Sequence, residues 1–415
     1  MDRPIVHIVG AGLAGLAAAI ALADGRREII LYEAARQAGG RCRSYFDTAL
    51  GMVIDNGNHL LLSGNHEARR FLRTIGSEAN LQGPTEADFP FFDLATGEHW
   101  RVRPNAGPLP WWVFSKNRRV PGTKPLDYLG LAKLLLTRED RKIGEILSDQ
   151  GPLYQKLWRP FLLAALNLEP PEGSSALAAS VIRETLAKGG QACRPMIAHP
   201  TLSAAFIEPA LAWLSQRGAE ICLDHRLRTI RFEGDRVAGL EFGDARMSLR
   251  PQDTLVLAVP APVAQELVPG LQAPQRFTAI VNAHFKITPP AGFPPILGLV
   301  NSVSEWLFAF PERLAVTISG ADHLLDEPRE VLAAKIWAEV AKVTQIAAPL
   351  PAWQILKEKR ATFAATPEEN ARRPGARTAF ANLVLAGDWT ATGLPATIEG
   401  AIRSGNFAAR ALLAN

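Results

Sequence analysis

The sequence predicts an α/β fold with a parallel sheet flanked by helices, joined to a mixed α+β part made of an antiparallel sheet and helices. Near the N-terminus, Gly10, Gly12 and Gly15 separate an apolar run from an Ala/Leu-rich run. Near the C-terminus, an apolar run, a turn that contains Asp388 and a helical pattern follow in the same order. Strand, glycine turn and helix form the first unit of a Rossmann-type domain, so both chain ends are expected to build one such domain.

The N-terminal turn has the spacing of a dinucleotide-binding motif. After a strand over residues 5–9, Gly10 permits the tight reversal, Gly12 lets the backbone approach a pyrophosphate, and Gly15 lets the next helix pack closely. The helix over residues 13–23 then directs its free N–H groups at the phosphates. Glu33 ends the next apolar run, where a carboxylate can accept hydrogen bonds from ribose hydroxyls. This stretch alone leaves FAD and NAD both open.

A second glycine turn, with Gly39, Gly40 and Arg41, follows directly after this unit. Two adjacent glycines allow a close approach of the backbone to a ligand. The guanidinium beside them can pair with a phosphate through its planar fork. A plain surface charge is the alternative interpretation of Arg41.

Composition sets the outer bounds. With 415 residues, 47% hydrophobic and 21% charged, the chain can bury a large core and form two domains. The net charge of +4 is mild, and basic residues gather only at 116–124, so no nucleic-acid partner is expected. Cys42, Cys193 and Cys222 are widely spaced, which indicates neither disulfides nor a metal site. Without a signal-peptide pattern or a membrane-spanning apolar run, a cytoplasmic protein is expected.

The elements between the two ends divide the chain into five segments. Strands are expected at 29–32 and 52–54, and residues 89–190 are rich in Pro, Trp and Leu, which indicates helices interrupted by prolines. Residues 218–259 contain a hairpin and a buried strand, residues 277–319 several alternating strands, and residues 330–343 one long helix. We expect a discontinuous nucleotide domain over 1–88, 195–270 and 380–415, and a substrate domain over 89–194 and 271–379, with 108–190 mainly helical.

The combination of "GAGLAGLAAA", "GGRCRS", "DNGNH" and "LAGDWTATGLPATIEGAIRSGNFAAR" resembles the FAD-dependent amine oxidase and phytoene desaturase superfamily along essentially the whole chain. The resemblance implies FAD, with Asp388 at its ribityl or pyrophosphate part, the backbone of Ile398 near the flavin ring, and the strand residue Leu227 at the adenine. No cysteine lies in the C-terminal segment, so the FAD is expected to be noncovalent. The residues expected to bind it are Gly10, Ala11, Gly12, Leu13, Ala14, Gly15, Glu33, Gly39, Gly40, Arg41, Asn58, His59, Leu227, Gly387, Asp388, Thr397, Ile398 and Ala401.

Within that superfamily, "DNGNHLLLSGN", "WRPFLLAALN" and "GLPATIEGAIRSG" resemble the hydroxysqualene dehydroxylases, earlier described as squalene-associated FAD-dependent desaturases. Asn58 stands where that group has Gln, so the amide is kept but is one methylene shorter. The resemblance implies an apolar isoprenoid substrate and the reduction of hydroxysqualene to squalene by hydride from reduced FAD. A carotenoid-type desaturase and a flavin amine oxidase are the alternatives. No second glycine-rich unit for NADPH is evident, which leaves the electron donor open.

Two side chains are candidates for a catalytic role in such a reaction, His59 as the acid and Asn167 as an anchor. His59 follows the "DNG" turn, which in the superfamily lies close to the flavin, and it could protonate a leaving hydroxyl; it could equally just bond the backbone or the cofactor. Asn167 could anchor the hydroxyl, with a helix C-cap as the alternative. Asp55 is expected to stabilise its own turn, and Glu399 is expected at a helix start, where the dipole favours a carboxylate.

An aromatic stretch with Trp111, Trp112 and Phe114 precedes the basic residues Lys116, Arg118 and Arg119. Trp next to basic residues is typical of a segment that dips into an anionic leaflet, here to collect a water-insoluble substrate at the inner face of the cell membrane. A core helix with a solvated basic end is the alternative.

Overall fold

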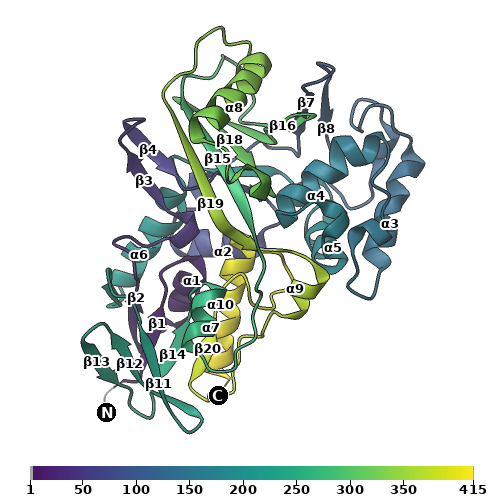
Figure 1. Cartoon of the computed structure of the whole chain (residues 1–415). Coiled ribbons are helices and arrows are strands. Elements are labelled where there is room, and N and C mark those ends of the chain that lie inside the picture. The colour runs from purple at the N-terminus through teal and green to yellow at the C-terminus, as the bar shows by residue number, and fades with distance from the viewer. Residues whose placement is uncertain (1–2, 415) are drawn as a thin grey trace.

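The structure is a computed structural model and describes residues 3–414. Figure 1 shows a parallel five-stranded sheet in the lower part of the molecule and a seven-stranded sheet in the upper part. Short helices lie at the right of this view, and both ends of the chain lie at the bottom, beside the parallel sheet.

The parallel sheet joins strands that are far apart in the sequence. β1 pairs with β2 on one side and with β14 on the other, so an N-terminal strand sits at the centre. β20 then pairs with β14, which brings the C-terminal strand into the same sheet. In order across the sheet, the strands are β10 (Glu220–Cys222), β2 (Glu28–Tyr32), β1 (Ile5–Val9), β14 (Thr254–Leu257) and β20 (Leu383–Leu385).

The helix after the N-terminal glycine turn packs directly on the helix after the C-terminal turn. α1 (Leu13–Leu22) starts at the N-terminal turn, and α10 (Ile398–Leu413) starts after the C-terminal turn. Gly405 of α10 lies so close to α1 that a Cβ built on it would be 2.2 Å from the carbonyl oxygen of Ala14. The alanines and glycines of both helices allow this close approach, and the two chain ends become one unit.

The upper sheet is antiparallel except for one pair, β16 with β7. One of its faces packs on α8 (Arg329–Thr344), and its core includes Phe285, Leu307 and Trp337. In order, the strands are β19 (Trp353–Phe363), β15 (Phe277–Lys286), β18 (Arg313–Ile318), β17 (Trp306–Phe310), β16 (Ile296–Val300), β7 (Phe89–Asp93) and β8 (His99–Val102).

The remaining elements surround these two sheets. Helices between residues 111 and 184 include one short turn, η3 (Trp111–Phe114), and three longer helices: α3 (Gly130–Leu136), α4 (Arg159–Leu166) and α5 (Ser175–Glu184). Three small sheets are formed by β3 (Ser44–Asp47) and β4 (Met52–Asp55); by β5 (Leu60–Leu62), β9 (Pro195–Ala198) and β6 (Leu81–Gln82); and by β11 (Thr229–Glu233), β12 (Arg236–Phe242) and β13 (Ala245–Ser248). The other helices are α2 (His66–Thr74), α6 (Glu208–Ser215), α7 (Ala261–Leu267) and α9 (Pro367–Ala371).

Most of the predicted elements are confirmed. The predicted hairpin is β11 with β12, the buried strand is β14, and the long helix is α8. β19, which is eleven residues long and forms the edge of the upper sheet, was not predicted. The division into two domains at the expected boundaries stays a prediction.

Candidate functional site

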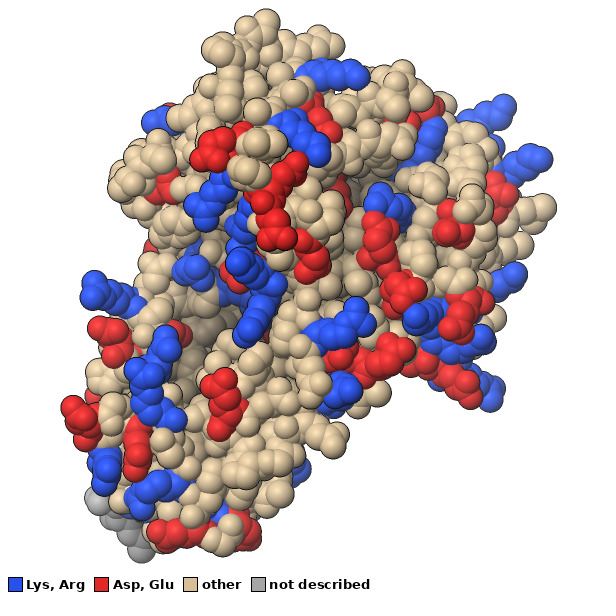
Figure 2. Space-filling model, in the orientation of Figure 1, with Lys and Arg blue, Asp and Glu red and all other residues tan. Residues whose placement is uncertain are grey.

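A cavity of about 1030 Å³ lies between the two sheets and reaches under the helices of residues 111–184. Figure 2 shows the molecular surface hollowed between the lower and upper parts, with Lys and Arg side chains along the recess. The volume is at the upper end of what small-molecule sites have, so the cavity can hold a cofactor together with part of a substrate. Of the residues expected to bind FAD, all but Ala11 and Gly15 line it.

The N-terminal turn is shaped for close approach. Gly10 has a φ of +107°, and a Cβ on it would lie 2.3 Å from the carbonyl oxygen of Ala258. A Cβ on Gly12 would have no other atom within 4 Å, so the backbone of Gly12 faces open space at the start of α1. Gly15 lies behind this space, where it packs against the carbonyl oxygen of Gly10. An open glycine backbone at a helix N-terminus fits the pyrophosphate of a dinucleotide.

Glu33 and Leu227 both line the cavity. The two carboxylate oxygens of Glu33 accept hydrogen bonds from the backbone N–H groups of Ala11 and Ala35, each at 2.9 Å, so the side chain is fixed at the end of β2. Leu227 lines the cavity, but the expectation that it is a strand residue is wrong. It lies in the segment between β10 and β11, which the apolar pattern did not separate from the strand that follows.

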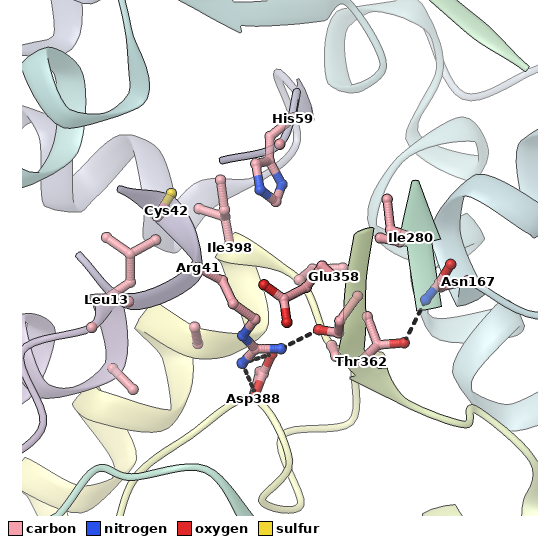
Figure 3. Close-up of a pocket in the computed structure, with 18 of the residues that line it drawn as sticks. Leu13, Arg41, Cys42, His59, Asn167, Ile280, Glu358, Thr362, Asp388 and Ile398 are labelled. Carbon is pink, nitrogen blue, oxygen red and sulfur yellow. Dashed lines mark hydrogen bonds and ion pairs between the residues drawn. The ribbon is translucent and has the colours of Figure 1, made fainter. Parts of the chain in front are cut away.

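Arg41 and Asp388 meet across 347 positions of sequence (Figure 3). The guanidinium Nη2 lies 2.7 Å from one carboxylate oxygen and 2.8 Å from the other, and Nη1 donates to the carbonyl oxygen of Ala361. The pair joins the second glycine turn to the C-terminal turn and to β19. Arg41 was expected to pair with a phosphate, and the structure gives it a carboxylate partner at the cavity wall.

Arg373 stabilises the C-terminal loop of residues 388–392 through hydrogen bonds. This buried side chain donates to the backbone oxygens of Asp388 and Thr390 and, at 3.0 Å, to the hydroxyl of Thr392. Burial lowers the pKa of Arg373 to about 10, which leaves the cation protonated at neutral pH. Arg373 could not be predicted from the sequence, because the residues around it form no motif that indicates a role at the site.

The start of α10 is capped by Thr397 and also carries Glu399, which caps a second helix. The Thr397 hydroxyl accepts the N–H of Gly400 at 3.0 Å. Glu399 lies in the first turn, as expected, but its carboxylate accepts the N–H groups of Glu67 and Ala68 at the start of α2 at 3.0 and 2.8 Å. Glu399 therefore connects two helices, and its desolvation raises its pKa.

Asn58 and His59 follow β4 at the edge of the cavity. The Asn58 amide donates to the Thr317 hydroxyl at 3.3 Å, while its Oδ1 is buried without a partner. The His59 ring points toward Ile398 and Arg41 (Figure 3), and desolvation lowers its pKa to about 4. His59 is therefore neutral near pH 7, and it is poorly suited to store a proton.

Asn167 ends α4 in the left-handed conformation, with a φ of 52°. Its amide nitrogen donates to the hydroxyls of Thr278 and Thr362 at 3.0 and 2.9 Å, and its Oδ1 accepts the N–H of Gly320 at 2.7 Å. The C-cap interpretation is confirmed, and the side chain already has protein partners on both ends. Its role as an anchor for a substrate hydroxyl stays a prediction.

Asp55 stabilises its surroundings, as expected. One of its oxygens accepts hydrogen bonds from the Ser44 hydroxyl at 2.6 Å and from the N–H of Leu202 at 2.9 Å, and Arg313 lies 3.8 Å from the other. Its burial raises its pKa.

The end of the cavity away from the glycine turns is apolar. The upper sheet contributes aromatic side chains from β7 and β17, and α4 contributes Phe161 from the other side. Four aromatic residues of this wall come from residues 89–190 and two from β17, and no local sequence pattern connected β17 with a substrate. The aromatic residues of this wall are Phe89, Phe91, Trp112, Phe161, Trp306 and Phe308.

Next to this apolar end, large apolar side chains are exposed within residues 109–136. Trp112 is buried and lines the cavity, while its neighbour Trp111 is 65% exposed and Phe114 is 64% exposed. The interpretation of this segment as a core helix is wrong, because η3 is a single short turn with two outward aromatic rings. The exposed apolar residues here are Leu109, Trp111, Phe114, Leu126, Leu129 and Leu136.

Over residues 3–414, no helix is both long and apolar enough to cross a membrane. Within the same range, no group of three His, Cys, Asp or Glu side chains is arranged to hold a metal ion. The three cysteines are free thiols.

Comparison with known proteins shows the family. Residues 13–413 match the model of the flavin containing amine oxidoreductases. Hydroxysqualene dehydroxylase of Rhodopseudomonas palustris is 56% identical over 99% of this chain and 98% of its own length, and that of Sinorhizobium fredii is 53% identical over 97% of each chain. A zeta-carotene desaturase of Synechocystis is only 24% identical over 99% of this chain and 97% of its own length.

Among solved structures, a protein described as a protoporphyrinogen oxidase from Exiguobacterium covers all of this chain and of its own, with a TM-score of 0.72 at 18% identity. This likeness shows the fold, an α/β domain joined to a sheet-rich part, and the family match shows that the cofactor is FAD. By its sequence, the chain belongs to the flavin-containing amine oxidoreductases and, within them, to the hydroxysqualene dehydroxylases.

Proposed function

We propose that this protein is an FAD-dependent oxidoreductase that reduces hydroxysqualene to squalene. The observation that carries the proposal is the close match along the whole chain to two hydroxysqualene dehydroxylases. The cavity supports it, because one end is built from glycine turns and charged groups and the other end from aromatic side chains. FAD, when bound and reduced, supplies a hydride to carbon.

The polar end of the cavity holds the cofactor. The open backbone at Gly12 and the N-terminus of α1 receive the pyrophosphate, and Glu33 is fixed where it can reach ribose hydroxyls. The Arg41–Asp388 pair and the N-terminus of α10 border the space for the ribityl chain and the flavin ring. No cysteine lies in the C-terminal segment, and Cys42, which lines the cavity, belongs to the second glycine turn, so a noncovalent cofactor is proposed.

The apolar end holds the hydrocarbon. Phe91 stacks on Trp100 with 5.4 Å between ring centroids and packs tilted against Trp306 at 5.6 Å, which makes a rigid wall. Such a wall excludes water from the reacting carbon and presents ring faces to positive charge that develops there when an allylic C–O bond breaks. The same wall would also suit a carotenoid, so the desaturase function is the second candidate.

The test is direct product analysis. Protein loaded with FAD is reduced under anaerobic conditions and mixed with hydroxysqualene, and the extract is analysed for squalene. We expect squalene to form and the flavin to become oxidised in equal amount. In parallel, oxidised protein is mixed with phytoene and with a simple amine. Bleaching of the flavin by phytoene or by the amine, without squalene formation in the first reaction, would replace this proposal with a desaturase or an amine oxidase.

We also propose that residues 109–136 contact the inner face of the cell membrane and bring the substrate to the cavity. The exposed apolar residues of this segment adjoin the basic residues Lys116, Arg118 and Arg119, and Trp112 links the segment to the cavity wall. The test is flotation with anionic vesicles. We expect the wild type and Val331→Ser, which alters an exposed apolar residue of α8, to float, and the double variant Trp111→Ser/Phe114→Ser to stay at the bottom. Equal flotation of all three would contradict this contact.

A further inference from the structure

One carboxyl group beside the cavity has no part in the function described so far. Glu305 lies in the turn between β16 and β17, directly before Trp306 of the aromatic wall. Its Oε2 accepts the backbone N–H of Ser319 at 2.8 Å, and the Ser319 hydroxyl also interacts with this carboxyl. Ser319 itself lines the cavity, at the end of β18. Glu305 therefore stands one side chain away from the space that holds the substrate.

The outer side of Glu305 faces charged groups. Arg159 at the start of α4 and Glu169 form an exposed ion pair with 2.5 Å between Nη2 and Oε1, and both act electrostatically on Glu305. Arg159 favours the charged form of Glu305, and Glu169 opposes it. Glu305 thus lies between a solvated pair on the surface and a hydroxyl inside the cavity, which is the placement that a proton path requires.

The protonation of Glu305 suits such a path. Desolvation raises its pKa from 4.5 to about 7, against the opposite effects of the Ser319 hydrogen bonds and of Arg159. A group with a pKa near the ambient pH is protonated part of the time and is quickly reprotonated from solvent, which is the condition for efficient acid catalysis.

Five other polar side chains around the cavity are less suited. His59 is neutral at pH 7, and the Asn167 amide is bonded at both ends. The Glu399 carboxylate caps α2, and Glu184 is paired with Arg403 at 2.6 Å. Glu358 lies next to the Arg41–Asp388 pair (Figure 3), at the cofactor end.

We propose that Glu305 delivers a proton to the substrate through the hydroxyl of Ser319, an inference that rests on the proposed dehydroxylation. Glu305 gives its proton to the Ser319 oxygen as the Ser319 hydroxyl proton passes to the leaving oxygen of the substrate. The allylic C–O bond breaks, its electron pair stays with the oxygen, and water leaves. The carbon is reduced by the hydride that FAD supplies, and the Glu305 carboxylate takes up a new proton from solvent past the Arg159–Glu169 pair.

The test measures the rate of squalene formation in single turnovers of prereduced protein as a function of pH. We expect the wild-type rate to fall above pH 7 as Glu305 loses its proton. Glu305→Gln keeps the shape and the bond to the Ser319 N–H but carries no acidic proton, so its rate should drop by about 10²-fold or more and lose this pH dependence. Ser319→Ala should show a similar drop, and Glu305→Asp should recover part of the rate.

The matched control is Glu339→Gln. Glu339 of α8 accepts the N–H groups of Val303 and Ser304 at 2.9 and 2.8 Å, so it supports the same turn without touching the cavity. We expect this variant to keep the wild-type rate and pH profile. A readout independent of turnover is infrared difference spectroscopy on cofactor-free protein, in which a carboxyl band that titrates near pH 7 should be present in wild type and missing in Glu305→Gln.

The outcomes separate the two proposals. If the wild type makes no squalene at any pH, the proposed function is overturned. If the wild type makes squalene but Glu305→Gln keeps its rate and pH profile, or if no carboxyl titrates near pH 7, the proton path alone is overturned.

Discussion

The contact between α1 and α10 predicts a measurable cost for a single methyl group at Gly405. In Gly405→Ala, the new Cβ would lie 2.2 Å from the Ala14 carbonyl oxygen and 2.8 Å from the Ala17 Cβ. Overpacking costs about 1–3 kcal/mol, and the upper end applies because a helix backbone cannot rotate away as a side chain does. Alanine in place of glycine inside a helix returns about 1 kcal/mol. The free energy of unfolding should therefore fall by about 2 kcal/mol.

The assay is urea unfolding of the FAD-free protein, followed by titration of the folded protein with FAD. Because α1 carries the Gly10–Gly15 turn, the displaced helix should also weaken FAD binding. The control is Gly375→Ala, where a Cβ meets no atom within 4 Å, and its stability should stay within about 0.5 kcal/mol of wild type. A Gly405→Ala protein as stable as wild type, or more stable, would refute the close contact, since the helix preference for alanine would then dominate.

Three further variants test the site. His59→Ala should keep its turnover on bound flavin, because His59 is neutral near pH 7; a drop of about 10²-fold or more would make it the acid and would contradict the Glu305 path. In Arg41→Leu, the Asp388 side chain, which is 8% exposed, loses its cation, so the free energy of unfolding should fall by about 2 kcal/mol. Thermal melting measures this loss, and gel filtration should show that the variant releases FAD. An unchanged melting temperature would argue against this role of the ion pair. The folded pKa of Glu305 is raised from 4.5 to about 7, so the native state binds this proton more tightly and loses up to about 3 kcal/mol of stability as the pH rises through that window. Glu305→Gln should remove this loss in urea unfolding at a series of pH values, and an identical pH dependence of both proteins would show that Glu305 titrates normally.

The cofactor end of the site could be predicted from sequence because its determinants are local. A strand, three glycines and a helix set the position of the pyrophosphate within a few residues of each other, and Glu33 follows at the end of the next strand. Resemblance then supplied the distant partner at Asp388. The direct ion pair between Asp388 and Arg41 could not be read from either segment, because it depends on how β20 enters the sheet beside β14.

The substrate end was predicted only in outline. β19 escaped detection because residues 357–360 are all charged, which hides the apolar pattern of Ile355, Ala361 and Phe363 on either side. As the edge strand of the upper sheet it can carry those charges on its exposed part. Glu305 was missed for a similar reason, since its environment is created by Ser319 and Arg159, which come from other elements.

The meeting of Arg41 with Asp388 also sets the order of events during synthesis. The ribosome has to complete β20 and the turn after it before the cofactor end of the cavity has all its walls. Nascent chains that stop short of α10 should therefore carry no FAD.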